Sequence, residues 1–432
     1  MADPMETYGE MWEGLGINLR AHCALLDAIP KMYQSAYLEQ SNRPEGMKYF
    51  DFVVSEIHGL RIQELQEHKA KGGKVIGTFC LYVPEEIIRA LGALDIGLCA
   101  GAEWGYNEVE KVLPRNTCAL IKSFVGFKMD RVCPYVESAD LVIGETTCDG
   151  KKKAYEIFGE MAPMYVMELP QMKRPGDLAA WRSEIDRLVT RLEGVTGRKL
   201  TLENLKAATA EVNGKRRALQ RLNAARAASP APISGKDALL AVQVAFYDDV
   251  PRFTQMVNGI ADELEKRVAD GVGVAAADAP RVLVTGSPMA IPNWKVHDII
   301  EKSGAVVVAE EMCTGSRYYD KLTPEDGGTL GALLDGVAAK YLDINCACFT
   351  PNTARFDDVI RMAKENKVDG IVHYALQFCA PYQIEAYSLE KAAKAAGIPV
   401  LKIDTDYSME DVGQLQTRVE AFVEMVKEPV AV

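Results

Sequence analysis

Cysteine follows two strand-like runs of the sequence at the same relative position. The apolar run at residues 139–143 leads through Gly-Glu-Thr-Thr to Cys148, just beyond the end of a short buried strand. The run at 370–375 leads in a similar way to Cys379. Open α/β sheets bind their ligands at the carboxyl ends of the strands. Two sulfur atoms at two such edges predict a shared metal–sulfur site.

Most of the ten cysteines lie where they can reach one cleft. Two in each half of the chain follow strand-like runs: Cys80, Cys148, Cys313 and Cys379. Three more lie in irregular segments, from which a loop can bring a thiolate to the same place: Cys118, Cys346 and Cys348. Cys99 also ends a strand-like run, whereas Cys23 and Cys133 share none of these placements and are interpreted as structural, since free cysteine is often a small buried hydrophobic residue.

Iron–sulfur clusters suit such a set of thiolates, because cysteine is their usual ligand. Zinc would use up to four of these residues and leave the others unexplained. Helices expected to begin at Pro84 and Asp149 would direct backbone N–H groups toward the sulfur atoms and favour the thiolate form. The sequence contains neither a GxxxxGKS/T nor a GxGxxG motif, so electrons are expected to come from another protein.

Acidic residues and one histidine near the cysteines are candidates for supplying protons. Glu310, Glu311 and Asp149 are expected either in this role or as caps that bind backbone N–H groups of helices. The five histidines lack the spacing of a metal site, and only His373 lies on a strand that faces the expected cleft. A core histidine is the simpler interpretation of His373. The three lysines at 151–153 indicate either a solvated helix start or a docking surface.

Strand-like runs alternate with helical segments over two stretches of the chain. They lie at residues 74–79, 96–99, 139–143 and 164–169, and again at 282–284, 305–308, 370–375 and 400–403. This alternation predicts an α/β fold with two parallel sheets of about four strands, each covered by helices on both faces.

Helical patterns fill the remainder of the chain. An amphipathic helix is expected over 50–70, and long helices over about 175–269. The second stretch carries basic residues that are expected on a solvated face: Lys215, Arg216, Arg217, Arg221 and Arg226. The predicted organisation is a helical N-terminal segment (1–70), a first α/β domain (71–174), a helical connecting region (175–279) and a second α/β domain (280–432).

The composition excludes several classes of protein. The chain has 432 residues and a formal net charge of −12, which is unfavourable for binding nucleic acid or a membrane surface. No apolar run approaches the roughly 18 residues of a membrane span. The N-terminal residues lack the basic start and apolar core of a signal peptide. We therefore expect a cytoplasmic protein, in which thiols stay reduced.

Four short segments around the cysteines resemble the 2-hydroxyacyl-CoA dehydratase/benzoyl-CoA reductase family. They are Thr78-Phe79-Cys80 with Val83-Pro84-Glu85-Glu86, Cys118 followed by Lys122-Ser123, Thr146-Thr147-Cys148-Asp149-Gly150, and Gln377-Phe378-Cys379. The resemblance implies two flavodoxin-like (truncated Rossmann) domains with parallel four-stranded sheets and an iron–sulfur cluster between them. It also implies that Cys80, Cys118 and Cys379 hold one [4Fe-4S] cluster, as in the dehydratase subunits.

This chain has more sulfur than that pattern requires. Cys148, Cys313 and Cys348, with Cys346 as an alternative to Cys348, supply a second set of three. The segments 310–319 and 346–352 are similar to the double-cubane cluster proteins, a branch of the same family with an [8Fe-9S] cluster. The resemblance further implies a homodimer, a partner activator that hydrolyses ATP and delivers low-potential electrons, and reduction of small molecules such as acetylene.

Three functions stay open at this point. The first is a double-cubane reductase component with the six thiolates named above. The second is a subunit of a 2-hydroxyacyl-CoA dehydratase or aryl-CoA reductase with one [4Fe-4S] cluster. The third is a non-catalytic scaffold or storage protein for clusters. Eight iron atoms per chain would indicate the first function, and four would indicate the second.

Overall fold

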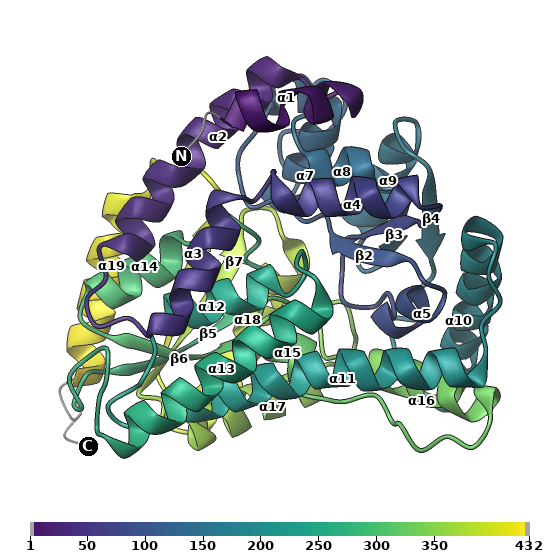
Figure 1. Cartoon of the computed structure of the whole chain (residues 1–432). Coiled ribbons are helices and arrows are strands. Elements are labelled where there is room, and N and C mark those ends of the chain that lie inside the picture. Colours follow the sequence, from purple (N-terminus) through teal and green to yellow (C-terminus); the bar gives the residue numbers. More distant parts are fainter. Residues whose placement is uncertain (1–3, 428–432) are drawn as a thin grey trace.

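Two parallel four-stranded sheets form the framework of the fold (Figure 1). The computed structural model describes residues 4–427 of the chain. The first sheet has the order β2-β1-β3-β4, with β1 (Val75–Thr78), β2 (Leu94–Gly97), β3 (Leu141–Glu145) and β4 (Met164–Met167). The second has the order β6-β5-β7-β8, with β5 (Arg281–Gly286), β6 (Val306–Glu311), β7 (Gly370–Leu376) and β8 (Val400–Thr405). The predicted α/β class with two flavodoxin-like sheets is confirmed.

Each sheet contains a topological switch point, where the connections from two adjacent strands lead to opposite sides of the sheet order. From β1 the chain crosses to β2 on one side, whereas β3 pairs with β1 on the other side. β5 has the same relation to β6 and β7. The carboxyl ends of strands at such a switch point border a crevice. Cys80 follows β1, Cys148 follows β3 and Cys379 follows β7, so the predicted placement of these cysteines beyond strand ends is right.

Helices cover both faces of the first sheet. They are α5 (Glu85–Ala90), α6 (Tyr106–Val109), α7 (Ala119–Met129), α8 (Pro134–Ser138) and α9 (Asp149–Gly159). Val142 of β3 packs in one hydrophobic cluster with Phe124 of α7 and Phe158 of α9. Its neighbour Ile143 packs on the opposite face in the cluster that contains Ile87 of α5. Figure 1 shows α7–α9 above this sheet and α5 below it. The two central strands, β1 and β3, are largely buried, whereas the outer strands β2 and β4 are partly exposed.

The second sheet is enclosed in the same manner. Its helices are α14 (Lys295–Lys302), α15 (Ser316–Tyr319), α17 (Thr353–Glu365), α18 (Ala380–Ala395) and α19 (Val412–Lys427). The remaining helix of this half, α16 (Leu330–Leu342), packs instead against α10 (Pro175–Thr196) and α11 (Leu202–Ala225). Ile371 of β7 packs with Val359 of α17 and Leu389 of α18. Val372 points to the other face, whose cluster includes Ile300 of α14 and Phe422 of α19.

The N-terminal segment is helical, as expected, but the helix predicted over 50–70 is wrong as a single element. The elements are α1 (Pro4–Gly14), α2 (Leu19–Tyr33), a π-helical turn (Gln34–Leu38), a 3-10 turn (Glu45–Met47), α3 (Lys48–Ser55) and α4 (Leu60–Ala70). α3 ends at Ser55, and residues 56–59 form turns before α4, with φ −103° and ψ −99° at Gly59. A Cβ atom at Gly59 would lie 2.4 Å from the ring of Tyr8, so this packing requires glycine.

The middle of the chain forms four helices that connect the two halves: α10 (Pro175–Thr196), α11 (Leu202–Ala225), α12 (Gly235–Val244) and α13 (Val250–Ala269). α11 packs against α5 of the first half and against α15 and α16 of the second half. Figure 1 shows it running along the lower edge of the molecule. The domain boundaries given above stay a prediction.

The basic side chains of α11 are not all on a solvated face, and this part of the prediction is wrong. Three of them are buried and bind buried carboxylates: Lys215 with Glu85, Arg216 with Glu86, and Arg226 with Glu310. A buried carboxylate is strongly unfavourable without a paired and hydrogen-bonded cation. Only Arg217 and Arg221 have exposed side chains, and both bind acidic residues at the surface.

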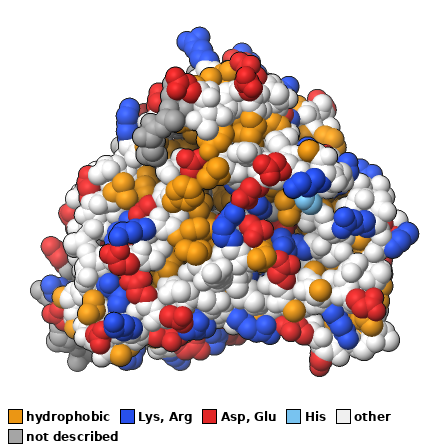
Figure 2. Space-filling model, in the orientation of Figure 1, with side chains coloured by type: hydrophobic (Ala, Val, Ile, Leu, Met, Phe, Trp, Pro, Cys, Tyr) orange, Lys and Arg blue, Asp and Glu red, His pale blue; other side chains and the backbone are white. Residues whose placement is uncertain are grey.

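Charges of both signs are interspersed on the surface. On the face shown in Figure 2, hydrophobic side chains gather near the middle, and Lys, Arg, Asp and Glu side chains mix around them. Within residues 4–427, no helix has the length and apolar character needed to cross a membrane.

Candidate metal–sulfur site

A cavity of about 1070 Å³ lies at the carboxyl ends of both sheets, lined by residues of both halves. Eight of the ten cysteines line it: Cys80, Cys99, Cys118, Cys148, Cys313, Cys346, Cys348 and Cys379. Cys23 and Cys133 are not among the lining residues. All the cysteines predicted as ligands therefore lie around one space.

Three of these cysteines stand immediately before helices. Cys118 is the N-cap residue of α7, Cys148 that of α9 and Cys379 that of α18. The Cys148 sulfur accepts the backbone N–H of Lys151 at 3.4 Å. Unpaired N–H groups and the helix dipole make such positions favourable for a thiolate. The helix expected to begin at Asp149 is present, and α5 begins at Glu85 with Pro84 as its N-cap residue.

Six of the thiols interact in three pairs, and two of the pairs join the two halves. The pairs are Cys80 with Cys313, Cys118 with Cys379, and Cys346 with Cys348. In each pair the interaction lowers the pKa of one thiol and opposes ionisation of the other. Burial also opposes a second charge in the pair. One sulfur of each pair is therefore favoured as a thiolate, the form that binds metal.

The remaining two thiols of the cavity differ from each other. Cys148 interacts electrostatically with Cys118 and Cys379, so it lies beside that pair. Cys99 donates its proton to the carbonyl oxygen of Phe79 at 2.8 Å. That bond gives Cys99 a structural role at the wall of the cavity.

Lys151 is a buried part of the site, which corrects the expectation of a solvated helix start or docking surface at this position. It lines the cavity, is only 6% exposed, and donates through Nζ to the carbonyl of Phe79 at 3.4 Å. Lys152 and Lys153 are exposed and bind Asp149 and Glu156. The first lysine of the run therefore brings a positive charge to the thiols, and only the other two are surface residues.

The candidate proton donors Glu310, Glu311 and His373 are not among the residues that line the cavity. Burial alone would raise the pKa of Glu310, but the ion pair with Arg226 outweighs burial and lowers it to about 2. Burial, followed by the charge of Arg355, lowers the pKa of His373 to about 3. The role of these residues as proton donors stays a prediction that the geometry does not support.

Polar side chains that contact the thiols were missing from the sequence analysis. Tyr82 lies with its hydroxyl 3.9 Å from the Cys348 sulfur, and Tyr382 with its hydroxyl 3.4 Å from Cys346. Arg317 donates to Cys313 at 3.9 Å. The available signal was spacing, because Arg317 follows Cys313 by four positions and Tyr382 follows Cys379 by three.

The donor set fits a polynuclear iron–sulfur cluster. Among the described residues, no group of three His, Cys, Asp or Glu side chains has the arrangement of a site for a single metal ion. The thiols instead surround a cavity much wider than one ion, with a buried lysine and several helix N-termini beside them. Cysteine thiolates from separate segments around a space of this kind are what a cluster requires.

Comparisons with known proteins agree with the motifs around the cysteines. The family described as "2-hydroxyglutaryl-CoA dehydratase, D-component" matches residues 80–426. The protein of Escherichia coli (strain K12) named "Putative dehydratase subunit YjiM" is 39% identical over 373 residues, which are 85% of this chain and 94% of that protein.

Two more distant relatives have names that state an activity. The (R)-phenyllactyl-CoA dehydratase beta subunit of Clostridium sporogenes is 24% identical over 386 residues, covering 87% of this chain and 98% of that protein. A benzoyl-CoA reductase subunit of Thauera aromatica is 24% identical over 360 residues, covering 79% of this chain and 87% of that protein. The chain belongs to the family of the 2-hydroxyglutaryl-CoA dehydratase D-component, within the 2-hydroxyacyl-CoA dehydratase and benzoyl-CoA reductase proteins that its cysteine motifs resemble.

Proposed function

We propose that this protein is the cluster-holding component of an iron–sulfur dehydratase or reductase. The observation that carries the proposal is the gathering of thiols from both halves around one cavity, with two interacting pairs that cross between the halves. Free cysteines placed for packing alone have no reason to meet in this way at two switch points. Names of the relatives, which include dehydratase and reductase subunits, support the same class of activity.

We propose that the thiols act in two groups, called sides below, which differ from the two sets expected from the resemblance. One side contains Cys80 and Cys313 with Cys346 and Cys348, and the other contains Cys118, Cys148 and Cys379. Cys148 also interacts with Cys346, so the two sides face each other across the cavity. The expected first set had joined Cys80 with Cys118 and Cys379. We assign three ligands to each side, with Cys346 and Cys348 as alternatives for the third ligand of the first side.

Two forms of this function differ in the amount of iron. The names of the relatives favour a subunit of a 2-hydroxyacyl-CoA dehydratase or aryl-CoA reductase with one [4Fe-4S] cluster. The number of thiols favours an [8Fe-9S] double cubane, because one cluster with three cysteine ligands would leave the other side of the cavity unused. In the second form the substrate is a small molecule such as acetylene.

The residues of the chain would act by holding and shielding the cluster. Thiolates bind iron, helix N-termini stabilise the negative charge on sulfur, and buried Lys151 balances part of that charge. When bound, the cluster would supply electrons of low potential to a substrate in the cavity. The absence of a P-loop motif from the sequence supports a separate activator protein that hydrolyses ATP. We propose that the present protein is a cytoplasmic homodimer that receives electrons from this activator.

Iron and acid-labile sulfide per chain, measured on anaerobically purified protein, test the proposal. We expect about eight iron and nine sulfide for the double cubane and about four of each for a single [4Fe-4S] cluster. Replacing Cys118 by Ser should reduce the iron content in both forms. Cys23→Ser is the matched control, because Cys23 lies outside the cavity, and it should retain all of the iron.

Cys313→Ser separates the two forms. Loss of iron from this variant supports the double cubane, whereas full retention at four iron atoms per chain assigns the single cluster to the other side. Zinc in place of iron, or iron content unaffected by Cys118→Ser, would contradict the proposed function.

A further inference from the structure

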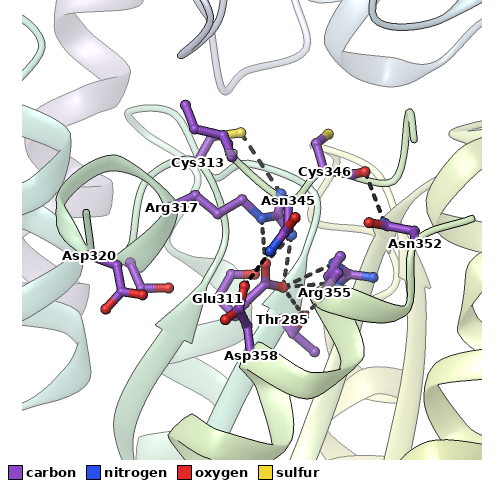
Figure 3. A network of polar contacts seen from close by, with 12 residues as sticks. Thr285, Glu311, Cys313, Arg317, Asp320, Asn345, Cys346, Asn352, Arg355 and Asp358 are labelled. Atoms are coloured by element: carbon purple, nitrogen blue, oxygen red, sulfur yellow. Dashed lines mark hydrogen bonds and ion pairs between the residues drawn. The ribbon is translucent and has the colours of Figure 1, made fainter. Parts of the chain in front are cut away.

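A buried polar network lies directly behind Cys313 and Cys346 (Figure 3). Its centre is Glu311 at the end of β6, which accepts hydrogen bonds from Arg317 and from Arg355 of α17. Thr285 of β5 also donates to Glu311. All four side chains are buried, so the network is shielded from water and its orientation is fixed by many contacts.

Arg317 faces the thiols because its other side is bound to Glu311. Its Nε and Nη2 groups donate to the two carboxylate oxygens of Glu311, and Nη2 also donates to the Glu311 backbone carbonyl at 3.2 Å. The third nitrogen, Nη1, points away from the carboxylate. It donates to the Cys313 sulfur at 3.9 Å and to the hydroxyl of Tyr382. A planar guanidinium held in this bidentate manner cannot rotate away from the sulfur.

Tyr382 links Arg317 to a second thiol by hydrogen bonds. The Tyr382 hydroxyl oxygen accepts the N–H of Arg317, which leaves its own proton free to be donated. The Cys346 sulfur lies 3.4 Å from this hydroxyl. The Tyr382 ring also packs under both guanidinium groups, with Arg317 5.3 Å and Arg355 5.1 Å from its centroid. Because Arg355 also binds Glu385, the two guanidinium groups of this network are balanced by two carboxylates. Cys313 and Cys346 thus receive hydrogen bonds from one connected network of side chains.

The other side of the cavity has no such unit. Backbone N–H groups of Leu120 and Ile121 favour the Cys118 thiolate, and the backbone N–H of Lys151 donates to the Cys148 sulfur at 3.4 Å. Over residues 4–427, no Arg or Lys side chain donates a hydrogen bond to Cys118, Cys148 or Cys379. The charge of buried Lys151 acts on thiols of both sides, on Cys80 and on Cys148. The two sides therefore differ in their hydrogen-bond donors, which are a guanidinium and a hydroxyl on one side and backbone N–H groups on the other.

We propose that Arg317 and Tyr382 are positioning residues that raise the reduction potential of the iron held by Cys313 and Cys346, so that this side of the site accepts the first electron. The inference rests on the proposed function. One electron from the donor protein adds one negative charge to the iron–sulfur unit, and no bond to cysteine breaks. A nearby cation and hydrogen bonds to sulfur stabilise the more negative, reduced state in a medium of low dielectric constant.

Redox titration of the iron-loaded protein, followed by electron paramagnetic resonance, tests the proposal. Tyr382→Phe keeps the ring and removes the hydroxyl, and it should lower the midpoint potential of the first reduction. Tyr387→Phe is the matched control, since Tyr387 lies on the same helix, is 72% exposed and has no contact with a thiol. Its midpoint potential should equal that of the unaltered protein.

Arg317→Lys provides a second comparison. Lysine keeps the positive charge but cannot form the bidentate hydrogen bonds to Glu311 that orient Nη1 of Arg317 toward the sulfur. The midpoint potential of the first reduction should therefore also fall. If Arg317→Lys does not fold, the midpoint potential of Tyr382→Phe is sufficient to test the inference. An unchanged first midpoint in Tyr382→Phe with full iron content overturns the inference, and so does loss of iron from that variant, which would assign the hydroxyl to holding the ligand. Absence of iron from the unaltered protein overturns the proposed function instead.

Discussion

Three polar residues near the thiols follow a cysteine by three or four positions. The pairs are Cys148 and Lys151, Cys313 and Arg317, and Cys379 and Tyr382. Residues at this spacing lie on the same face of a helix. Only Arg317 directs its side chain to the cysteine that precedes it, whereas the Tyr382 hydroxyl lies beside Cys346. The positions of the cysteines themselves could be predicted from strand ends. Their partners could not, because sequence does not tell which face of a short helix turns toward a cavity.

His373 illustrates a residue whose predicted position on a strand was right and whose surroundings could not be foreseen. It lies on β7 and is buried, and burial, followed by the charge of Arg355, lowers its pKa to about 3. In the unfolded chain the imidazole binds a proton near pH 6.5. The stability that the neutral ring contributes is therefore present above pH 6.5 and is lost as the pH falls from 6.5 toward 3.

Replacing His373 by Asn should make the free energy of unfolding less dependent on pH in that window. Urea unfolding at pH 7.5 and pH 5 measures the effect. We expect a smaller loss of stability between these two values in His373→Asn than in the unaltered protein. An equal loss would show that His373 is protonated in the folded protein, and would restore it as a candidate proton donor.

At the scale of elements, the strands were predictable because most of them are apolar runs bounded by polar or glycine residues, although β2 contains Asp95 and β8 contains Lys402 and Asp404. β5, β6 and β7 are buried along their whole length, which produces such runs. The helices of the middle region were harder to interpret. α11 has basic residues on its buried face, and a single sequence gives no sign that Glu85, Glu86 and Glu310 would meet them.

The ion pair between Glu310 of β6 and Arg226 at the end of α11 gives a prediction for stability. Both side chains are buried. Glu310→Gln leaves Arg226 without its counter-charge and should reduce the free energy of unfolding at pH 7 by about 3–5 kcal/mol. Chemical unfolding measures this change. Glu365→Gln removes an exposed partner of Arg361 and is the control, with an expected change below about 1 kcal/mol.

The pH dependence of the same pair follows from its lowered pKa. Glu310 titrates near 4.5 in the unfolded chain and at about 2 in the folded protein. Its contribution is therefore complete above pH 4.5 and is lost as the pH falls toward 2. The difference between Glu310→Gln and the unaltered protein should shrink over this range. A difference that is constant down to pH 2 would contradict the ion-pair interpretation.

At the scale of the molecule, the site exists only when both halves are together. Cys80 and Cys118 come from the first half, and the thiols with which they interact, Cys313 and Cys379, come from the second. α11 packs on elements of both halves and fixes their separation. Sequence analysis could predict two sheets with cysteines at their edges, but the choice of partner across the cavity depends on how the halves are docked.

Removal of the metal should therefore destabilise the whole protein. A cluster bound by residues of both halves binds only the folded state and stabilises it by mass action. Treatment with an iron chelator under reducing conditions should lower the thermal unfolding midpoint by several degrees, as measured by circular dichroism. Cys118→Ser, which should hold less iron, should show a smaller decrease. An unchanged midpoint after complete iron loss would show that the halves are held by protein contacts alone.

The thiol pairs also decide what happens to an empty site in air. Each pair brings two thiols close enough to interact, so oxygen, by removing two electrons and two protons, would join them in a disulfide. A bond between Cys80 and Cys313 would tie the halves together and consume two of the proposed ligands at once. The proposed cluster site is thus vulnerable to oxidation when it holds no metal, and its assembly would depend on keeping oxygen away until iron arrives.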